Sequence, residues 1–448
     1  MKKQLIVYLL ITGTIWSCSG PVERDTTYMA EIASIDRWLQ HTKVMKDDFQ
    51  IWPDAIDQPD KVSLSFSDGI SGKIIFYLQA YNETQNEKYL KEAAQGSEYV
   101  LEHLPQKSDT LQNVFWAFSP YGKVCGPAFA LLEMYKATGE DRYKTGAEHI
   151  VEVIDHFAVN KQDTLSWDLG NDVLGGLAGT GLFMLYAGET LQRGDLIQVA
   201  TKAGRTLISR AKKETGLSWK RGQNGRFELP NFSHGAAGIG YFMARLFEAT
   251  GDSLYLNAAL QANTYLESIA KTEGGVFLIP YGFPDIGWST PYDIGWAHGP
   301  AGVARFYRQL YKLTDDLKWK ERERACVAGI MTSGVPGPPA AGFGEEEFYL
   351  DSRFGIASVA FFLVDFESEE EEHLAFRDTL VKYIQSKSVV EEGRRYWPQV
   401  RYSFMANAGD TTAFTGYFYG AAGYGQVLLK AQARLNGTEY IRFVDDPY

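Results

Sequence analysis

The stretch Gly235-Ala-Ala-Gly238-Ile-Gly240 recurs near the end of the chain as Gly420-Ala-Ala-Gly423-Tyr-Gly425. Related turns keep the same spacing of two small residues: Gly69 and Gly72, Gly176 and Gly179, Gly299 and Gly302, Gly355 and Ser358, and a looser copy around Gly126. These seven glycine turns follow one another at intervals of 53 to 65 residues. Such internal self-similarity is the signature of a repeat architecture.

The residues between the turns have the pattern of two helices. Aromatic residues recur nine and seventeen positions after the second glycine, at Tyr81, Tyr135, Phe247 and Tyr311, and at Tyr89, Tyr143, Tyr255, Trp319 and Tyr440. Ile74, Leu78 and Tyr81 share one helical face. A polar segment rich in Thr, Gly and Asp separates the two helices of a copy. Each copy therefore predicts one helical hairpin.

Seven hairpins predict an all-α fold. Glycine at a helix start permits close backbone approach, which seven helices converging on one axis require. An open solenoid would need atypical polar copies at its ends, whereas the last copy here is among the best preserved. We therefore expect residues 61–448 to form a closed α/α toroid, a barrel of seven helical hairpins with an architecture like that of the six-hairpin glycosidases.

The first residues have the pattern of an export signal. Lys2 and Lys3 precede an apolar run too short to span a bilayer, and small residues flank Cys18. Residues 1–17 are therefore predicted to be a signal peptide, and the segment ending at Cys18 resembles a bacterial lipobox, whose cysteine is lipidated, as with palmitate. The alternative is an ordinary signal peptide with a chance cysteine. Ser19 in place of aspartate implies a lipoprotein of the bacterial cell envelope, anchored to the outer membrane and facing the periplasm or the surface.

Residues 18–60 are predicted to hold the lipidated cysteine, a polar tether and one leading helix. Ile35, Trp38, Leu39 and Val44 follow a helical rhythm in this segment. We expect this helix to pack on the ring or to complete it.

The composition limits the partners of the chain. A net charge of −12 argues against binding to nucleic acid or to an anionic lipid surface, so the lipid anchor is the expected link to a membrane. Aromatic residues make up 14% of the chain, which suits a cleft lined by rings. Cys125 and Cys326 lie in apolar runs and are expected to be buried free thiols, although two cysteines of an exported protein can also pair.

If the glycine-led helices are the inner ones, they all begin at one mouth of the ring. The residues just before each first glycine then gather there: Asp68, Gly122, Gly175, His234, His298, Phe354 and Tyr419. Seven helix N-termini favour anionic or polar ligand groups at such a mouth. Helix capping is a sufficient structural explanation for Asp68, but histidine is not a favoured cap.

Three of the turns resemble motifs of the lanthionine synthetase C-like family, whose fold is an α/α toroid of seven hairpins. Ser233-His234-Gly235 resembles its histidine-glycine motif, and Trp296-Ala297-His298-Gly299 resembles its tryptophan-cysteine-x-glycine motif. Asp172-Val-Leu-Gly-Gly176 resembles the motif that carries a catalytic aspartate. The resemblance covers residues from about 60 to the end, and it implies Asp172 and His234 as the acid/base pair.

The same resemblance implies that the usual metal is missing. Cyclases of the family hold zinc through two cysteines and a histidine, and zinc makes a substrate thiol nucleophilic. The corresponding positions are Ala297, Arg353 and Phe354 here. We therefore expect no cofactor; a metal site rebuilt around His298, with the carboxylates of Asp293, Asp351 and Glu347 in the same loops, remains the alternative.

Three functions follow from these patterns. The first is a zinc-free toroid that binds or modifies a peptide or thiol compound in a central cavity. The second is a glycan-active hydrolase or lyase of carbohydrate metabolism, with Asp172 and His234 as acid and base. The third is a non-catalytic binding scaffold. His298, Tyr419, Trp296, Asp68 and Asp293 are the expected ligand-binding residues, and further aromatics suited to stacking on sugar rings are Trp116, Trp167 and Trp288.

Overall fold

The computed structural model describes residues 24–447, except 112–115, 168–169, 221–227, 285–286, 288–289 and 345. The expected signal peptide, the lipidation site Cys18 and Trp288 lie outside the described residues. None of the described helices is long and apolar enough to cross a membrane.

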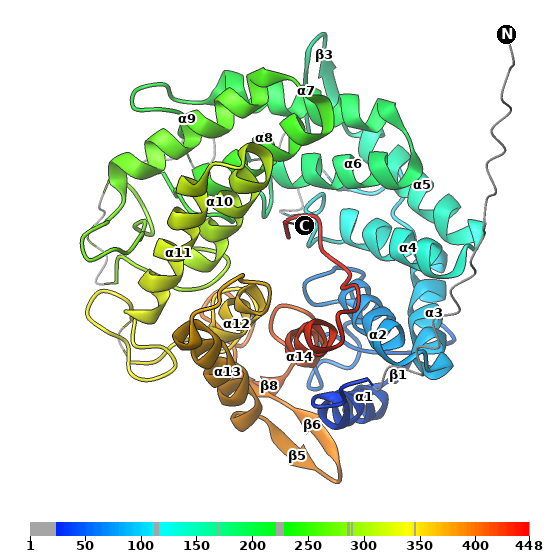
Figure 1. Cartoon of the computed structure of the whole chain (residues 1–448). Helices are drawn as coiled ribbons and strands as arrows, with labels where there is room; N and C mark the ends of the chain where they lie inside the picture. The colour runs from blue at the N-terminus through cyan, green and yellow to red at the C-terminus, as the bar shows by residue number, and fades with distance from the viewer. Residues whose placement is uncertain are drawn as a thin grey trace, which may run out of the picture.

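The described residues form two concentric layers of α-helices around one axis (Figure 1). The inner layer follows the seven glycine turns: α2 (Ile70–Thr84), α4 (Cys125–Thr138), α6 (Leu177–Leu191), α8 (Ala236–Thr250), α10 (Pro300–Thr314), α12 (Ile356–Val364) and α14 (Ala421–Asn436). The outer layer holds α1 (Met29–Thr42), α3 (Glu87–Glu102), α5 (Asp141–His156), α7 (Gly194–Arg210), α9 (Ser253–Ile269), α11 (Leu317–Met331) and α13 (Glu371–Ser386). The predicted all-α toroid is confirmed.

The ring is closed because the last inner helix, α14, packs against the first, α2. The outer partner of α14 is α1, which comes from the N-terminal side and buries Ile35 and Leu39 completely. Trp38 of α1 stacks on Tyr396 with ring centroids 5.5 Å apart. The leading helix therefore completes the ring, which begins N-terminally of residue 61.

The seventh repeat differs from its prediction. Tyr440 was expected in a second helix after α14, but residues 439–443 form neither helix nor strand. The chain instead turns toward the centre of the ring, where its red C-terminal segment is visible in Figure 1. The expectation of a hairpin there was wrong because α1 already occupies the outer position.

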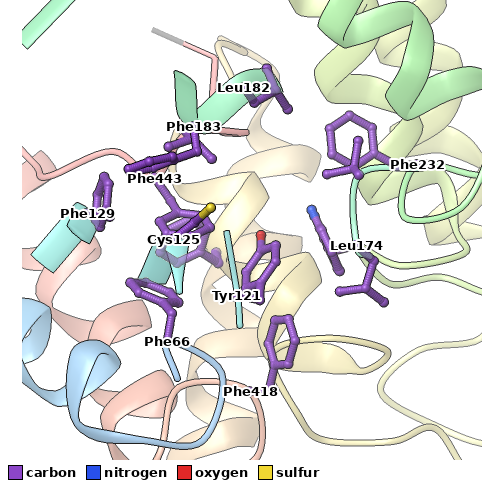
Figure 2. Close-up of a cluster of buried hydrophobic side chains, with 14 of the residues drawn as sticks. Phe66, Tyr121, Cys125, Phe129, Leu174, Leu182, Phe183, Phe232, Phe418 and Phe443 are labelled. Carbon is purple, nitrogen blue, oxygen red and sulfur yellow. The ribbon is translucent and has the colours of Figure 1, made fainter. Parts of the chain in front are cut away.

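This C-terminal segment fills the middle of the toroid. Phe443 stacks on Phe66, with centroids 4.1 Å apart, and contacts Phe129 and Tyr121 (Figure 2). The buried carboxylate of Asp445 then accepts hydrogen bonds from the hydroxyl of Tyr121 and the indole nitrogen of Trp296, each at 2.8 Å. The axis of the ring is thus a packed core, held in part by the end of the chain.

Short antiparallel β-hairpins lie in loops of the described part of the ring. They pair β1 (Val44–Lys46) with β2 (Phe49–Ile51), β3 (Val159–Lys161) with β4 (Thr164–Ser166), β5 (Val389–Glu391) with β6 (Arg394–Tyr396), and β7 (Pro398–Val400) with β8 (Thr411–Ala413). Tyr396, the partner of Trp38, lies on β6, so the β5–β6 hairpin packs on α1.

Both described cysteines are free and buried, as expected. The thiol of Cys125 donates to the carbonyl of Phe118 at 2.9 Å. Burial raises the pKa of both thiols well above its ordinary value. Neither is therefore a reactive thiolate.

The glycine turns need glycine because the preceding loop crosses each helix start. A Cβ atom at Gly235 would lie 1.4 Å from the carbonyl oxygen of Leu229, and one at Gly238 would lie 1.9 Å from that of Phe232. In both cases the obstructing carbonyl is six residues earlier in the sequence. The close approach that the glycines permit is thus to their own loop.

Candidate functional site

Backbone hydrogen bonds join neighbouring glycine turns around one end of the ring. The donor and acceptor lie two or three residues before the first small position of each turn: Leu174 N to Ser233 O, Ser233 N to Ala297 O, Ala297 N to Arg353 O, Ser352 N to Phe418 O, Phe418 N to Ser67 O, and Ser67 N to Tyr121 O. These bonds are 2.8 to 3.1 Å long. They fix the turns in register, so the residues just before each first glycine face the same mouth.

His234 is paired with Asp172 at this mouth. Its Nδ1 lies 2.9 Å from Oδ2 of Asp172, and both side chains are largely buried. The other carboxylate oxygen, Oδ1, accepts from the backbone N–H of Gly175 at 2.7 Å. Asp172 therefore shapes its own turn and also orients the imidazole of the next one. Nε2 of His234 has no hydrogen-bond partner among the described residues.

His298 forms a second histidine–aspartate pair in the following turn. Its Nδ1 lies 3.5 Å from Oδ2 of Asp293. Burial lowers the pKa of His298 to about 4, against a smaller opposing effect of Asp293. The imidazole is therefore neutral at neutral pH. Within the described structure, its buried Nε2 has no hydrogen-bond partner.

The structure brings Asp172, His234 and His298 together. The register of the repeat predicted this for the two histidines, and the family resemblance implied it for Asp172. The two imidazole centroids are 5.6 Å apart, and the ring of Phe354 from the next turn lies 5.2 Å from that of His298. The two histidine–aspartate pairs thus stand side by side at one part of the mouth. Such an arrangement can accept, hold and return protons.

The positions that resemble the family's zinc ligands do not fit a metal ion. Ala297 and Arg353 are adjacent through a 2.9 Å backbone hydrogen bond, so the three positions do lie in one place. However, they offer a methyl group, a guanidinium and the phenyl ring of Phe354, none of which is a zinc ligand. In the part of the chain that the structure describes, no group of three or more His, Cys, Asp or Glu side chains is placed to hold a metal ion.

Arg353 instead brings a permanent positive charge to this place. Its guanidinium lies 4.5 Å from the ring centroid of Phe354 and 4.6 Å from that of Trp116. It donates to the hydroxyl of Tyr419 at 2.9 Å. The positive charge of Arg353 also contributes to lowering the pKa of His298, after burial and His234.

Asp351, which the sequence suggested only as a carboxylate of a rebuilt metal site, forms a third polar pair with Tyr402, a residue that no sequence pattern singled out. The hydroxyl of Tyr402 donates to Oδ2 of Asp351, while Oδ1 accepts from the backbone of Arg353 and Phe354 at 2.7 Å. Burial raises the pKa of the Asp351 carboxyl. A signal was available, because Asp351 lies four residues before Gly355 just as Asp172 lies four residues before Gly176.

The remaining expected site residues have other contacts. Trp296 is buried and directed to Asp445, so it contacts the C-terminal segment and not the mouth. Asp68 accepts from the hydroxyl of Ser67 at 2.8 Å, and burial raises the pKa of its carboxyl. Tyr419 is buried beside Arg353. Burial raises the pKa of the Tyr419 hydroxyl, and the negative charge of Asp68 adds a smaller increase.

A cavity of about 640 Å³ opens beside His298. Its described walls come mainly from three loops and carry eight aromatic residues and three carboxylates: Tyr281, Thr290, Tyr292, Asp293, His298, Phe343, Gly344, Glu346, Glu347, Phe348, Tyr349, Phe354, Tyr402, Ser403 and Phe404. Its volume is in the range of small-molecule sites. The cavity is therefore at the side of the mouth, because the axis itself is filled.

Comparisons with known proteins agree with this architecture. Nisin cyclase superposes with a TM-score of 0.63 at 15% identity, covering 94% of this chain and 98% of that one. The Lin0763 protein of Listeria innocua has a TM-score of 0.50 at 12% identity, covering 92% and 98%. Cellobiose 2-epimerase from Bacillus thermoamylovorans has a TM-score of 0.50 at 11% identity, covering 90% and 97%. These likenesses concern the fold alone.

Comparison with curated protein sequences gave no match. The model of the lanthionine synthetase C-like proteins, in contrast, matches residues 60–337, which include the turns of both histidines and of Asp172. This match spans more than half of the chain, and the protein therefore belongs to the lanthionine synthetase C-like family.

Proposed function

We propose that this protein is a zinc-independent acid–base enzyme that transfers protons on a small hydroxylated ligand of the carbohydrate class. The observation that carries the proposal is the pair of histidine–aspartate couples, with imidazole centroids 5.6 Å apart, of which the couple of His298 and Asp293 lines a cavity. Each aspartate lies at Nδ1 of its histidine. This pairing favours the tautomer that leaves Nε2 as the basic nitrogen.

The two histidines have different roles in this proposal. Nε2 of His234 removes a proton from the carbon beside the carbonyl group of an open-chain sugar, and the electron pair moves onto the carbonyl oxygen, which gives an enediolate. The imidazolium, stabilised by Asp172, then returns the proton to the adjacent carbon. His298 relays the hydroxyl proton between the two oxygens, so that atoms and charge balance in a carbonyl isomerisation.

Proton transfer is favoured over the hydrolysis that the sequence also suggested. Glycoside hydrolases use two carboxyl groups that flank the scissile bond. Asp172 and Asp293 are instead each engaged with a histidine. The aromatic walls of the cavity suit a sugar, and one protein with the same fold is named a cellobiose 2-epimerase, so the fold is compatible with sugar chemistry.

Modification of a thiol compound is less well supported. Thiol activation in the family depends on zinc, and Ala297, Arg353 and Phe354 supply no ligand for it. Binding of a peptide without chemistry, and a purely structural ring, are the outcomes that a failed activity test would favour.

The test is deuterium exchange. The protein is incubated in D₂O with a panel of aldoses, ketoses and uronates, and loss of the carbon-bound proton is followed by NMR. We expect exchange with at least one sugar, reduced about 100-fold or more in Asp172→Asn and His234→Asn. His156→Asn, an exposed histidine on α5, is the matched control and should retain activity. Absence of exchange with every sugar, or equal exchange in the variants, would contradict the proposal.

We also propose that the mature chain is anchored to the cell envelope through Cys18. The basic start, the apolar run and the cysteine support this localisation. Labelled palmitate should be incorporated into the protein in cells, and Cys18→Ser should abolish the labelling and release the protein from the membrane fraction. Unchanged membrane association of the variant would refute the anchor.

A further inference from the structure

The cavity beside His298 has a charge imbalance that the proposed proton transfer does not use. Its described walls contain the carboxylates of Asp293, Glu346 and Glu347 and no lysine or arginine. No ion pair joins Glu346 or Glu347 to a described cation. Two described cations contact wall residues without lining the cavity: Arg353 is buried 4.5 Å from the ring centroid of Phe354, and the ammonium of Lys271 lies 5.9 Å from that of Tyr292.

Aromatic rings stand between these carboxylates. Tyr292 and Phe343 have ring centroids 5.7 Å apart, and Tyr349 meets Tyr402 edge to face at 4.7 Å. The faces of such rings attract cations, most strongly where water is partly excluded. Carboxylates interleaved with aromatic faces are the chemistry that recognises an ammonium group.

A second observation points independently to a ligand. His298 lines the cavity with only 6% of its surface exposed, and its Nε2 has no hydrogen-bond partner among the described residues. A buried polar atom without a partner destabilises the protein until a hydrogen-bonding group reaches it. A hydroxyl or amine group of a ligand entering the cavity would provide that partner.

We infer that the cavity takes a ligand with a protonated amino group, and that an amino sugar is the substrate class. The sugar part of this inference rests on the proposed function, whereas the ammonium group rests on the carboxylates and rings of the cavity alone. Glu346 and Glu347 set the preference for positive charge, and His298 binds a polar group of the same ligand at the inner wall.

The test is calorimetric binding to the full protein at pH 7. The 2-amino-2-deoxyhexoses glucosamine, galactosamine and mannosamine are compared with their parent hexoses and their N-acetyl derivatives. We expect at least one amino sugar to bind about 10-fold or more tightly than both neutral counterparts, and added salt to weaken this preference. The double variant Glu346→Gln/Glu347→Gln should lose most of the preference. Glu391→Gln/Glu392→Gln on the β5–β6 hairpin makes the same charge change far along the sequence and should keep it.

The outcomes separate this inference from the proposed function. Equal affinity for amino and neutral sugars, no binding of any amino sugar, or an unchanged preference in Glu346→Gln/Glu347→Gln overturns the inference. If neutral sugars nevertheless exchange deuterium in a manner that depends on His234, the proposed function stands without it. If amino sugars bind selectively but no sugar exchanges, the charge preference stands and the catalytic proposal fails.

Discussion

Acidification should destabilise the protein through His298, and His298→Asn should remove this effect. An imidazole in the unfolded chain takes up a proton near pH 6.5. In the folded protein, burial lowers the pKa of His298 to about 4. Between these two values the unfolded chain binds a proton that the folded chain does not bind, so the free energy of unfolding falls as the pH falls.

The magnitude follows from the size of the pKa difference. Each pH unit within the window corresponds to about 1.4 kcal/mol. The folded and unfolded values of His298 differ by between two and three units, so its contribution approaches about 3 kcal/mol at pH 4. The loss begins near pH 6.5 and is complete near pH 4.

The assay is urea-induced unfolding at pH 7, 6, 5 and 4.5, followed by circular dichroism for wild type, His298→Asn and the control His156→Asn. The three proteins share every carboxylate, so the difference between wild type and His298→Asn reports the loss of this one imidazole. The free energy of unfolding of wild type should fall more steeply than that of His298→Asn, whereas His156→Asn should follow wild type. Parallel curves for wild type and His298→Asn would refute the reasoning that burial keeps this histidine neutral.

Further predictions concern the ring itself. Gly235→Ala places a Cβ atom 1.4 Å from the carbonyl oxygen of Leu229 and should lower the free energy of unfolding by about 2 kcal/mol or more. Gly194→Ala, whose added Cβ meets no atom within 4 Å, should be tolerated. Thermal unfolding of the two variants measures the difference. Trp38→Ala should cost about 3 kcal/mol, because this buried side chain anchors α1 on Tyr396, and an unchanged melting temperature would contradict the role of α1 in closing the ring. Asp445→Asn weakens the side-chain bonds to Tyr121 and Trp296 and the 3.5 Å ion pair with Arg305, and should cost about 2 kcal/mol in the same measurement. An effect no larger than that of the exposed substitution Glu392→Gln would count against a structural role for the C-terminal segment.

The inner layer of the toroid could be predicted from the sequence because one local rule repeats. Each inner helix needs small residues where the preceding loop crosses its start, and Gly235 and Gly238 are an example. The small residues therefore recur at a fixed spacing that the sequence shows. The outer helix of the last hairpin obeys no such rule. It is supplied by α1, about 380 residues earlier, and Tyr440 matched the repeat spacing without being in a helix. Ring closure is a property of the whole chain and leaves no local signal.

The candidate site was predictable only where it belongs to the repeated turns. His234 and His298 occupy the same position of successive turns, so the register alone predicted that they lie together, whereas Asp172 came from the family resemblance. Glu346, Glu347 and Tyr402 come from loops that vary between copies, and their place on the cavity follows only from the folded loops. Trp296 was expected at the mouth because of its position in a motif, but it turns inward to a carboxylate 149 residues later in the chain.

Arg353 links the family relationship to the different chemistry proposed here. It occupies a position that resembles a zinc ligand of the family, and it brings a fixed positive charge in place of a metal-binding group. A guanidinium cannot bind a thiolate as zinc does, but it acts at a distance on nearby titratable groups. Here it adds to the burial that keeps His298 neutral, and it is held in place by Tyr419 and by aromatic rings. The substitution therefore removes a metal-binding position and at the same time favours an unprotonated imidazole, which is what a proton-transfer site needs.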